Sequence, residues 1–196
     1  MEDNKRIYIS PGHGDGHGKR VGRITEDNIV LGVSLILKHL LEEQGGYEVM
    51  LARDGDYYVS LSSRVKESKK FKADLLLAIH ANSHSYPDKN NSIFGFEAFI
   101  HDELSDSRDN IFVAHLLSAY GAEFEDKPLM RNRGKKEDNF YLLRQRPAKA
   151  NVLFELNFMT NPMMLAFMNS SFGQYRMSKG LFEGIKTYTN KLKRKA

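Results

Sequence analysis

Short, strand-like apolar segments alternate along this chain with longer segments of helical period, and this alternation restricts the fold more than any other feature. The segments RIYIS, YEVML and DLLLAI predict strands, whereas residues 25–43 and 61–71 predict helices. Alternating strands and helices are typical of βαβ units, in which helices cover a mostly parallel sheet. We therefore expect an α/β fold: a single domain with a twisted, mostly parallel sheet and helices on both faces.

The remaining segments complete this pattern. Thr25 suits the N-cap of the first helix, and the two glycines after Gln44 suit its end. The later segments predict a strand at 92–100, a helix at 110–120, a basic surface loop at 129–139, extended chain at 140–143 and 151–156, and a helix at 172–193. A length of 196 residues fits one domain, so we treat residues 1–196 as a single unit.

Composition excludes several classes of protein. The chain has no cysteine, which excludes disulfides and cysteine-based zinc sites, so any metal must sit on His, Asp or Glu. The net charge of +4 favours weak attraction to polyanions, but the basic residues are dispersed and form no groove-reading motif. We therefore expect no nucleic-acid partner. No apolar run approaches the ~20 residues of a membrane span, and the first residues lack the apolar stretch of a secretory signal.

Ionisable side chains gather where the predicted strands end. His13 follows the first strand in the loop SPGHGDGHG, His80 follows DLLLAI, and Glu155 lies inside the apolar segment NVLFELNF. Glu26 falls in the first turn of the helix after the glycine-rich loop. Because the carboxyl ends of parallel strands meet at one edge, we expect these four side chains to lie close together.

Each of these residues also has a simpler interpretation. His13 alone could be a turn residue, and Glu26 alone could favour the positive end of a helix dipole. Glu155 is harder to explain, because burying a carboxylate among apolar side chains is costly unless it is paired, protonated or close to a cation. His17 and His84 each follow a candidate histidine by four residues, and we rank them as substrate-side or supporting groups.

Two imidazoles and one carboxylate form the His₂Glu ligand set of catalytic zinc sites. A second carboxylate nearby can act as general base, because zinc lowers the pKa of water to about 7. The chemistry that this combination implies is metal-assisted hydrolysis of an amide.

The order of the motifs resembles one family. SPGHG, the glutamate of ITEDN, AIHAN and VLFELNFMTN are similar to the zinc-dependent N-acetylmuramoyl-L-alanine amidases of the Amidase_3 type. The resemblance extends to LARDGD, VSLSSR, GFEAFI and RNRG, and so spans nearly the whole chain. It implies hydrolysis of the amide that joins N-acetylmuramic acid to L-alanine in peptidoglycan, by a single catalytic domain.

The resemblance also implies roles for individual residues. The zinc ligands of the family match His13, Glu26 and His80, and its catalytic glutamate matches Glu155. Three positions depart from the family pattern: Ser10 stands where an acidic residue is common, Ala52 precedes Arg53 where the family has threonine, and Asn157 replaces a glycine. None of these departures removes a ligand or the base, but they bear on substrate preference.

Two alternatives stay open from the sequence. The chain could be a non-catalytic wall-binding module of the same fold, or a zinc peptidase or deacetylase that acts on another amide. We expect a monomer that acts on the bacterial cell wall, released by a phage, made as a mother-cell lytic enzyme, or excised from a secreted protein. The basic residues of the 129–139 loop, Arg131, Arg133, Lys135 and Lys136, could steer the anionic wall or could simply be solvated.

Overall fold

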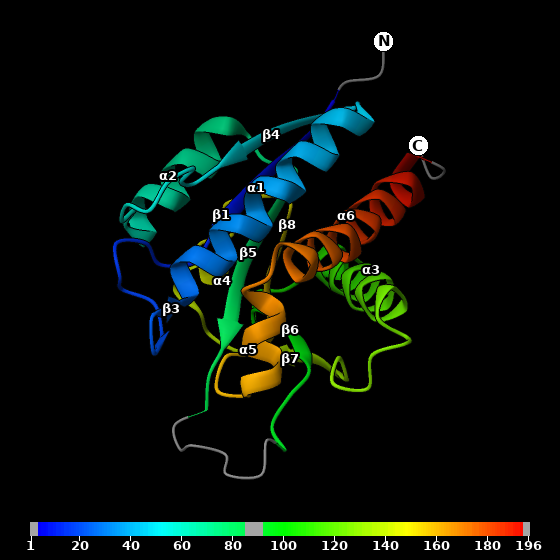
Figure 1. Cartoon of the computed structure of the whole chain (residues 1–196). Helices are drawn as coiled ribbons and strands as arrows, with labels where there is room; N and C mark the ends of the chain where they lie inside the picture. Colours follow the sequence, from blue (N-terminus) through cyan, green and yellow to red (C-terminus); the bar gives the residue numbers. More distant parts are fainter. Residues whose placement is uncertain (1–3, 85–91, 194–196) are drawn as a thin grey trace.

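The computed structural model describes residues 4–84 and 92–193, which form a six-stranded sheet between two layers of helices (Figure 1). The strand order is β4-β1-β5-β8-β6-β7. The strands are β1 (Lys5–Pro11), β4 (Tyr47–Leu51), β5 (Leu75–Asn82), β6 (Phe96–Ile100), β7 (Asn132–Glu137) and β8 (Ala150–Phe158). Every pair of neighbours is parallel except β6 and β8, which are antiparallel. The predicted α/β fold with a mostly parallel sheet is confirmed.

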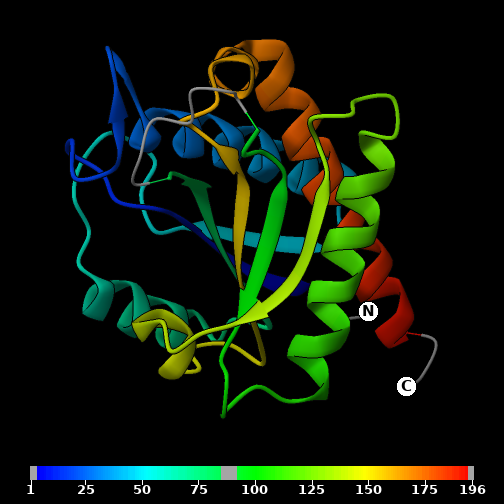
Figure 2. The same ribbon diagram turned by 90° about the horizontal axis from the view of Figure 1, so that it is seen from below.

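Helices cover both faces of the sheet, as predicted (Figure 2). One face carries α1 (Glu26–Gln44), α3 (Ser107–Glu123), α5 (Pro162–Met168) and α6 (Ser171–Lys193), and the other carries α2 (Leu61–Phe71) and α4 (Tyr141–Arg144). Each layer has its own apolar core. The larger core packs Val33, Leu116 and Leu181 of the long helices on the sheet, and the smaller one packs Val65 and Leu142 beneath it.

The parallel pairing brings the carboxyl ends of β1, β5 and β8 to one edge of the sheet. Pro11 of β1 pairs with Ile79 of β5, and His80 of β5 pairs with Glu155 of β8. A short hairpin of β2 (Arg20–Val21) and β3 (Ile24–Thr25) then leads the chain into α1. This edge holds every candidate residue that the sequence singled out by its position at a strand end.

Two local predictions were wrong. Residues 129–139 are not all loop, because Asn132–Glu137 forms β7, an exposed edge strand paired with β6. Residues 140–143 are not extended, because Tyr141–Arg144 forms a helical turn that buries the adjacent residues Leu142 and Leu143 in the smaller core. In a strand, these two neighbours would point to opposite faces of the sheet. The helical turn lets both side chains pack in the smaller core, so packing determines the conformation. Helix α5 was not predicted; Asn161 caps it and Pro162 is its first residue.

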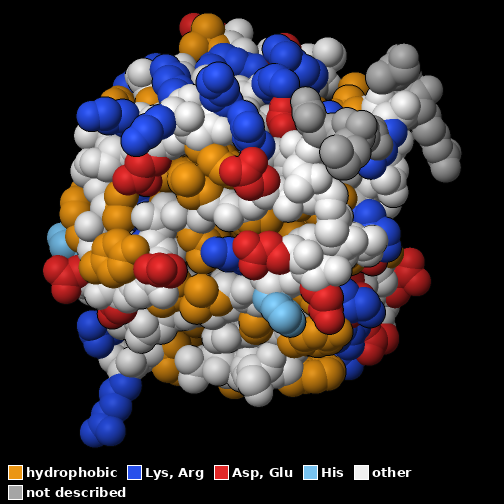
Figure 3. All heavy atoms as spheres, turned by 90° about the horizontal axis from the view of Figure 1, so that it is seen from above, with side chains coloured by type: hydrophobic (Ala, Val, Ile, Leu, Met, Phe, Trp, Pro, Cys, Tyr) orange, Lys and Arg blue, Asp and Glu red, His pale blue; other side chains and the backbone are white. Residues whose placement is uncertain are grey.

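In the part of the chain that the structure describes, no helix has both the length and the hydropathy needed to cross a membrane. Lys and Arg side chains gather in a band at the end of the molecule away from the sheet edge that holds the candidate residues (Figure 3).

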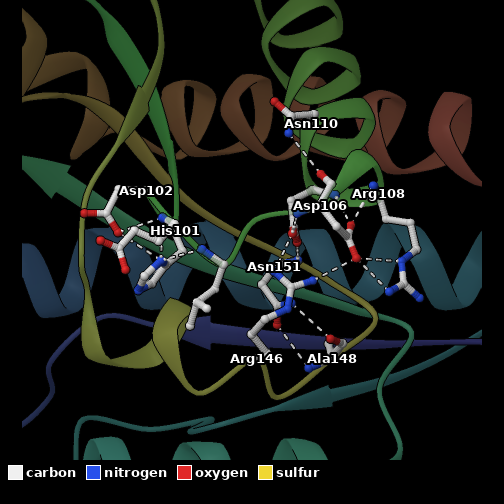
Figure 4. Close-up of polar contacts among 11 residues, drawn as sticks. His101, Asp102, Asp106, Arg108, Asn110, Arg146, Ala148 and Asn151 are labelled. Carbon is white, nitrogen blue, oxygen red and sulfur yellow. Dashed lines mark hydrogen bonds and ion pairs between the residues drawn. The ribbon is translucent and has the colours of Figure 1, made fainter.

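A polar network joins α3, the start of β8 and the segment before β8 (Figure 4). It lies at the end of the strands opposite to the candidate residues. Asp109 is buried at its centre and accepts hydrogen bonds from the backbone N–H of Asn151 (2.6 Å) and of Asp106 (2.8 Å). The guanidinium of Arg146 donates to the same carboxylate. The carboxylate of Asp106 caps α3 in return, so this one network fixes the helix and the central strand together.

We predict that Asp109→Ala lowers the free energy of unfolding by about 2–4 kcal/mol, because it removes the carboxylate that accepts from the N–H groups of Asn151 and Asp106 and leaves Arg146 with Asp106 alone as its carboxylate partner. Urea denaturation followed by circular dichroism measures this loss. The matched control is Arg108→Gln, which removes an exposed ion pair of the same network and costs at most about 1 kcal/mol. An Asp109→Ala chain within 1 kcal/mol of the wild type would contradict the assignment.

Candidate metal centre

His13, Glu26 and His80 meet at the carboxyl edge of the sheet, with one potential ligand atom from each within 4.8 Å of the others. The Oε1 atom of Glu26 lies 3.2 Å from Nε2 of His13 and 3.0 Å from Nδ1 of His80. The two imidazole rings stand edge to face with centroids 5.0 Å apart. The structure therefore brings together the three residues that the sequence predicted as a ligand set, from β5, the loop after β1 and the start of α1.

Glu26 is buried and is fixed by the backbone as well as by the histidines. Its carboxylate accepts hydrogen bonds from the N–H of Ala81 (3.2 Å) and of Lys19 (3.2 Å). Thr25 occupies the N-cap position, as predicted, although its side chain makes no capping hydrogen bond. Glu26 lies in the first turn of α1, and N–H groups of β5 and of the glycine-rich loop fix the position of its carboxylate.

The hydrogen bonds of the cluster also set the charge of Glu26. Burial by itself raises the pKa of Glu26, but the hydrogen bonds from His13 and His80 outweigh it and hold that pKa well below its usual range. In return, the hydrogen bond with Glu26 raises the pKa of His13 against the opposing effect of burial. Glu26 is therefore ionised at neutral pH and offers a full negative charge to a cation.

The glycines of the loop allow this approach. His13 has φ +53° and Gly14 has φ +117°, so the chain turns through left-handed conformations directly at the candidate ligand. A Cβ on Gly12 would lie 2.5 Å from the ring of His80. The lack of a side chain at this position is what lets the two histidines come together.

Two buried arginines hold the same loop from behind. Arg53 donates to the carbonyl oxygens of Gly12 (2.7 Å) and Asp27 (2.9 Å). Arg64 donates to the carbonyl oxygens of Pro11 (2.5 Å) and His13 (2.7 Å). Both guanidinium groups thus fix the backbone that carries His13, a role that was not predicted from the sequence.

Polar side chains complete the support of the loop. Asp27 is buried and accepts hydrogen bonds from the N–H groups of Gly14 and Gly18. Ser10, which stands where an acidic residue is common in the resembling family, accepts a hydrogen bond from Arg64 at 2.8 Å. At this position a neutral hydroxyl, and not a carboxylate, accepts from the guanidinium of Arg64.

Glu155 lies beside the cluster, on the neighbouring strand β8. It pairs in register with His80 and, together with His13 and His80, lines both clefts that open at this edge. Its Oε2 atom is buried and has no hydrogen-bond partner among the described residues. Burial, and then the negative charges of Glu26 and Glu97, raise the pKa of Glu155 well above its usual value.

Glu97 of β6 is a further buried carboxylate at this edge, and it was not predicted from the sequence. It pairs in register with Glu155 and accepts hydrogen bonds from Asn82 (2.8 Å) and Arg133 (2.6 Å). Lys136 contacts it at 2.7 Å. A glutamate inside the apolar segment GFEAFI was the signal that could have found it.

The pairing of Glu97 bears on the basic residues expected to steer the wall. Arg133 and Lys136 are engaged by Glu97, and Lys135 forms an ion pair with Glu137 at 2.7 Å. Three of the four cations therefore have a carboxylate partner within the protein, which favours a structural role for this strand.

The other histidines lie outside the cluster. His17 contacts the carbonyl oxygen of Gly14 through Nδ1 and packs on Tyr58, with ring centroids 4.6 Å apart. His84 follows the end of β5, where its N–H donates to the hydroxyl of Thr160. His101 is buried in a turn and accepts hydrogen bonds from the N–H groups of Glu103 and Leu104.

Asn157, the residue in place of a family glycine, links strand β8 to two loops. Its Oδ1 atom accepts a hydrogen bond from the N–H of Gly95 at 2.9 Å, and its Nδ2 donates to the carbonyl of Leu129 at 3.0 Å. The amide therefore fixes the segments that precede β6 and β7, close to Glu97.

The raised pKa of Glu155 gives a prediction for stability. In the unfolded chain this carboxyl ionises near pH 4.3, whereas the folded protein keeps it protonated to higher pH. Below the pKa of Glu155 in the unfolded chain, the carboxyl is neutral in both states and the free energy of unfolding has its full value. As pH rises towards the pKa of Glu155 in the folded protein, this free energy falls. The side chain of Glu155→Gln is always neutral. The free energy of unfolding of this variant should therefore increase relative to that of the wild type as pH rises above about 4.5, by up to about 1.4 kcal/mol for each pH unit.

Urea unfolding of chelator-treated protein between pH 4 and pH 8 measures this difference. Glu183→Gln, at a half-exposed helix position paired with Lys186, is the control and should show no such trend. A difference between Glu155→Gln and the wild type that does not change with pH would mean that Glu155 is ordinarily ionised in the folded protein.

Comparison with known proteins agrees with the geometry. Residues 7–187 match the Amidase_3 family, described as N-acetylmuramoyl-L-alanine amidase. The sporulation-specific N-acetylmuramoyl-L-alanine amidase of Bacillus subtilis is 31% identical over 150 residues, which cover 71% of this chain and 51% of that protein. This chain therefore spans about half the length of that relative.

Solved structures share the fold. The catalytic domain of CwlV, an N-acetylmuramoyl-L-alanine amidase from Bacillus (Paenibacillus) polymyxa var. colistinus, superposes with a TM-score of 0.83 at 26% identity, covering 95% of this chain and 98% of the other. An N-acetylmuramoyl-L-alanine amidase from Clostridium difficile 630 shows the same fold with a TM-score of 0.85 at 24% identity, covering 96% and 98%. This chain belongs to the Amidase_3 family of N-acetylmuramoyl-L-alanine amidases.

Proposed function

We propose that this protein hydrolyses the amide bond between N-acetylmuramic acid and L-alanine in peptidoglycan, with zinc as its cofactor. The observation that carries the proposal is the convergence of His13, Glu26 and His80 within 4.8 Å, next to Glu155, in a chain that matches the family over residues 7–187. The named activity of the relatives supports the choice of this amide. The substrate then places the protein's action at the bacterial cell wall, and we expect it to act there as a monomer.

The donor set fits zinc. Two imidazole nitrogens and one carboxylate oxygen are a known ligand set of catalytic zinc sites, which keep one position open. Glu26 supports this choice because its low pKa keeps it charged and its hydrogen bonds to Ala81 and Lys19 hold it in place. When bound, zinc supplies Lewis-acid chemistry: it polarises a carbonyl group and makes water a stronger acid.

Glu155 is the proton carrier in this proposal. Its carboxylate takes a proton from the attacking water and returns it to the nitrogen of the leaving L-alanine, so that one residue serves as general base and then as general acid. Its position beside the ligand set, with an Oε2 atom that has no hydrogen-bond partner among the described residues, supports this role because the carboxyl is not engaged elsewhere in the protein. Glu97 does not compete for this role, since its carboxylate is occupied by Arg133 and Lys136.

Arg53 and Arg64 act in this mechanism as positioning residues. They hold the carbonyl groups on either side of His13, so that its imidazole keeps one orientation. A ligand on a loop of left-handed residues would otherwise sample several positions, which weakens metal binding.

The first test is metal content. We expect the purified protein to bind one zinc ion per chain, and His13→Ala or His80→Ala to lose it, because two remaining ligands hold zinc poorly. Elemental analysis after dialysis against a weak chelator measures this content. The control is His39→Ala, since this exposed histidine of α1 lies 3.9 Å from Glu43, outside the candidate metal centre, and its loss should leave zinc unchanged. Full zinc content in His13→Ala would contradict the ligand assignment.

The second test is turnover. We predict that Glu155→Ala keeps its zinc but hydrolyses peptidoglycan at least about 10²-fold more slowly, as expected for loss of a general base. The assay follows new L-alanine amino termini released from purified cell walls, and mass spectrometry of the products separates this cleavage from peptidase or deacetylase activity. Glu183→Gln is the control for a distant acid. Near-normal turnover in Glu155→Ala would remove Glu155 from this role, and walls left intact by wild-type protein that holds zinc would indicate a binding module.

A further inference from the structure

Two clefts of opposite character meet at the candidate metal centre. Both are lined by His13, His17, His80 and Glu155, so the reaction site lies where they join. We call them the apolar cleft, of about 540 Å³, and the polar cleft, of about 460 Å³. An amide held at the junction must send its two halves in different directions.

The apolar cleft is walled by aromatic and aliphatic side chains: Tyr58, Val59, Leu61, Phe140, Tyr141 and Leu142. Tyr58 and Tyr141 expose 52% and 37% of their surface, so their rings are available to a ligand. Both walls are supported from behind. His17 packs on Tyr58 with centroids 4.6 Å apart, and Phe140 packs edge to face on Phe99 at 5.2 Å.

Apart from the residues at the junction, Arg64 is the one charged group among the described residues of the apolar cleft. It is buried and its guanidinium already donates to Val59, Ser10, Pro11 and His13. The cleft therefore offers flat apolar surface and no free charge, which suits a neutral ligand with apolar C–H faces.

The polar cleft has the opposite chemistry. Beyond the junction it is lined by Glu26, which belongs to the candidate metal centre, and by Gly18, Lys19, Ala81, Asn82 and Ser83. The amide of Asn82 is engaged by Glu97 and by the N–H of Ser83, so the groups left for a ligand are the cation of Lys19 and the hydroxyl of Ser83. Such groups suit a chain of peptide bonds that carries carboxylates.

We propose that the saccharide of the substrate lies along the apolar cleft, on Tyr58 and Tyr141, while the stem peptide leaves through the polar cleft past Lys19. This assignment rests on the proposed function, because it takes the scissile amide to join a sugar to a peptide. The sugar is uncharged along its ring faces and the peptide carries the carboxylates, so each half matches the cleft that it would occupy.

The test uses the two products separately, so it does not depend on turnover. A peptide-free disaccharide of N-acetylglucosamine and N-acetylmuramic acid, and the tripeptide L-alanyl-γ-D-glutamyl-L-lysine, are titrated into the zinc-loaded protein and followed by NMR. Tyr58→Ala and Tyr141→Ala should each weaken the disaccharide by about tenfold and leave the tripeptide unchanged, because they remove apolar surface from one cleft only. Lys19→Gln should weaken the tripeptide and leave the disaccharide unchanged.

Two further variants keep the result interpretable. Tyr58→Phe retains the ring and should bind the disaccharide like the wild type, whereas Tyr175→Ala removes an equally exposed tyrosine of α6 and should affect neither ligand. The proposal is overturned if the tyrosine variants weaken the tripeptide instead, if they leave the disaccharide unaffected, or if the wild type binds no disaccharide. If the wild type binds the disaccharide through Tyr58 but has no amidase activity, the proposed function is rejected and the assignment of the saccharide to the apolar cleft stands.

Discussion

The arrangement of the site depends on one buried anion, the carboxylate of Glu26. It stands at the first turn of α1, accepts hydrogen bonds from two backbone N–H groups and lies within 3.2 Å of two imidazole nitrogens. A carboxylate in such a place is stable only while its neighbours compensate its charge. Glu26 therefore connects the glycine-rich loop, β5 and α1, and each of these segments has its position fixed by the same group that gives the site its negative charge.

The sequence contained enough information for the overall fold and for the four central residues. Alternating apolar segments predicted a parallel sheet between helices, and parallel strands bring their carboxyl ends together, so His13, His80 and Glu155 could be expected at one edge. The structure has this sheet and this convergence. The catalytic and metal-binding roles of these residues stay predictions, because geometry gives their positions and not their chemistry.

The features that the sequence did not reveal depend on contacts between distant segments. The polar segment 132–137 becomes a strand only because β6 offers it an edge, and residues 141–144 become helical because Leu142 and Leu143 both fit the core under the sheet. In the same way, Arg53 and Arg64 look like surface cations until the loop that they hold is folded over them. Local propensity says little where tertiary packing decides.

The position of β8 in the sheet has a consequence for biosynthesis. Strand β8 is the last to be made, yet it lies between β5 and β6 in the interior of the sheet. A nascent chain on the ribosome thus carries His13, Glu26 and His80 long before it carries Glu155, and it has no partner for the inner edge of β5 until then. In the proposed mechanism, the proton carrier is therefore added only with the strand that joins β5 to β6.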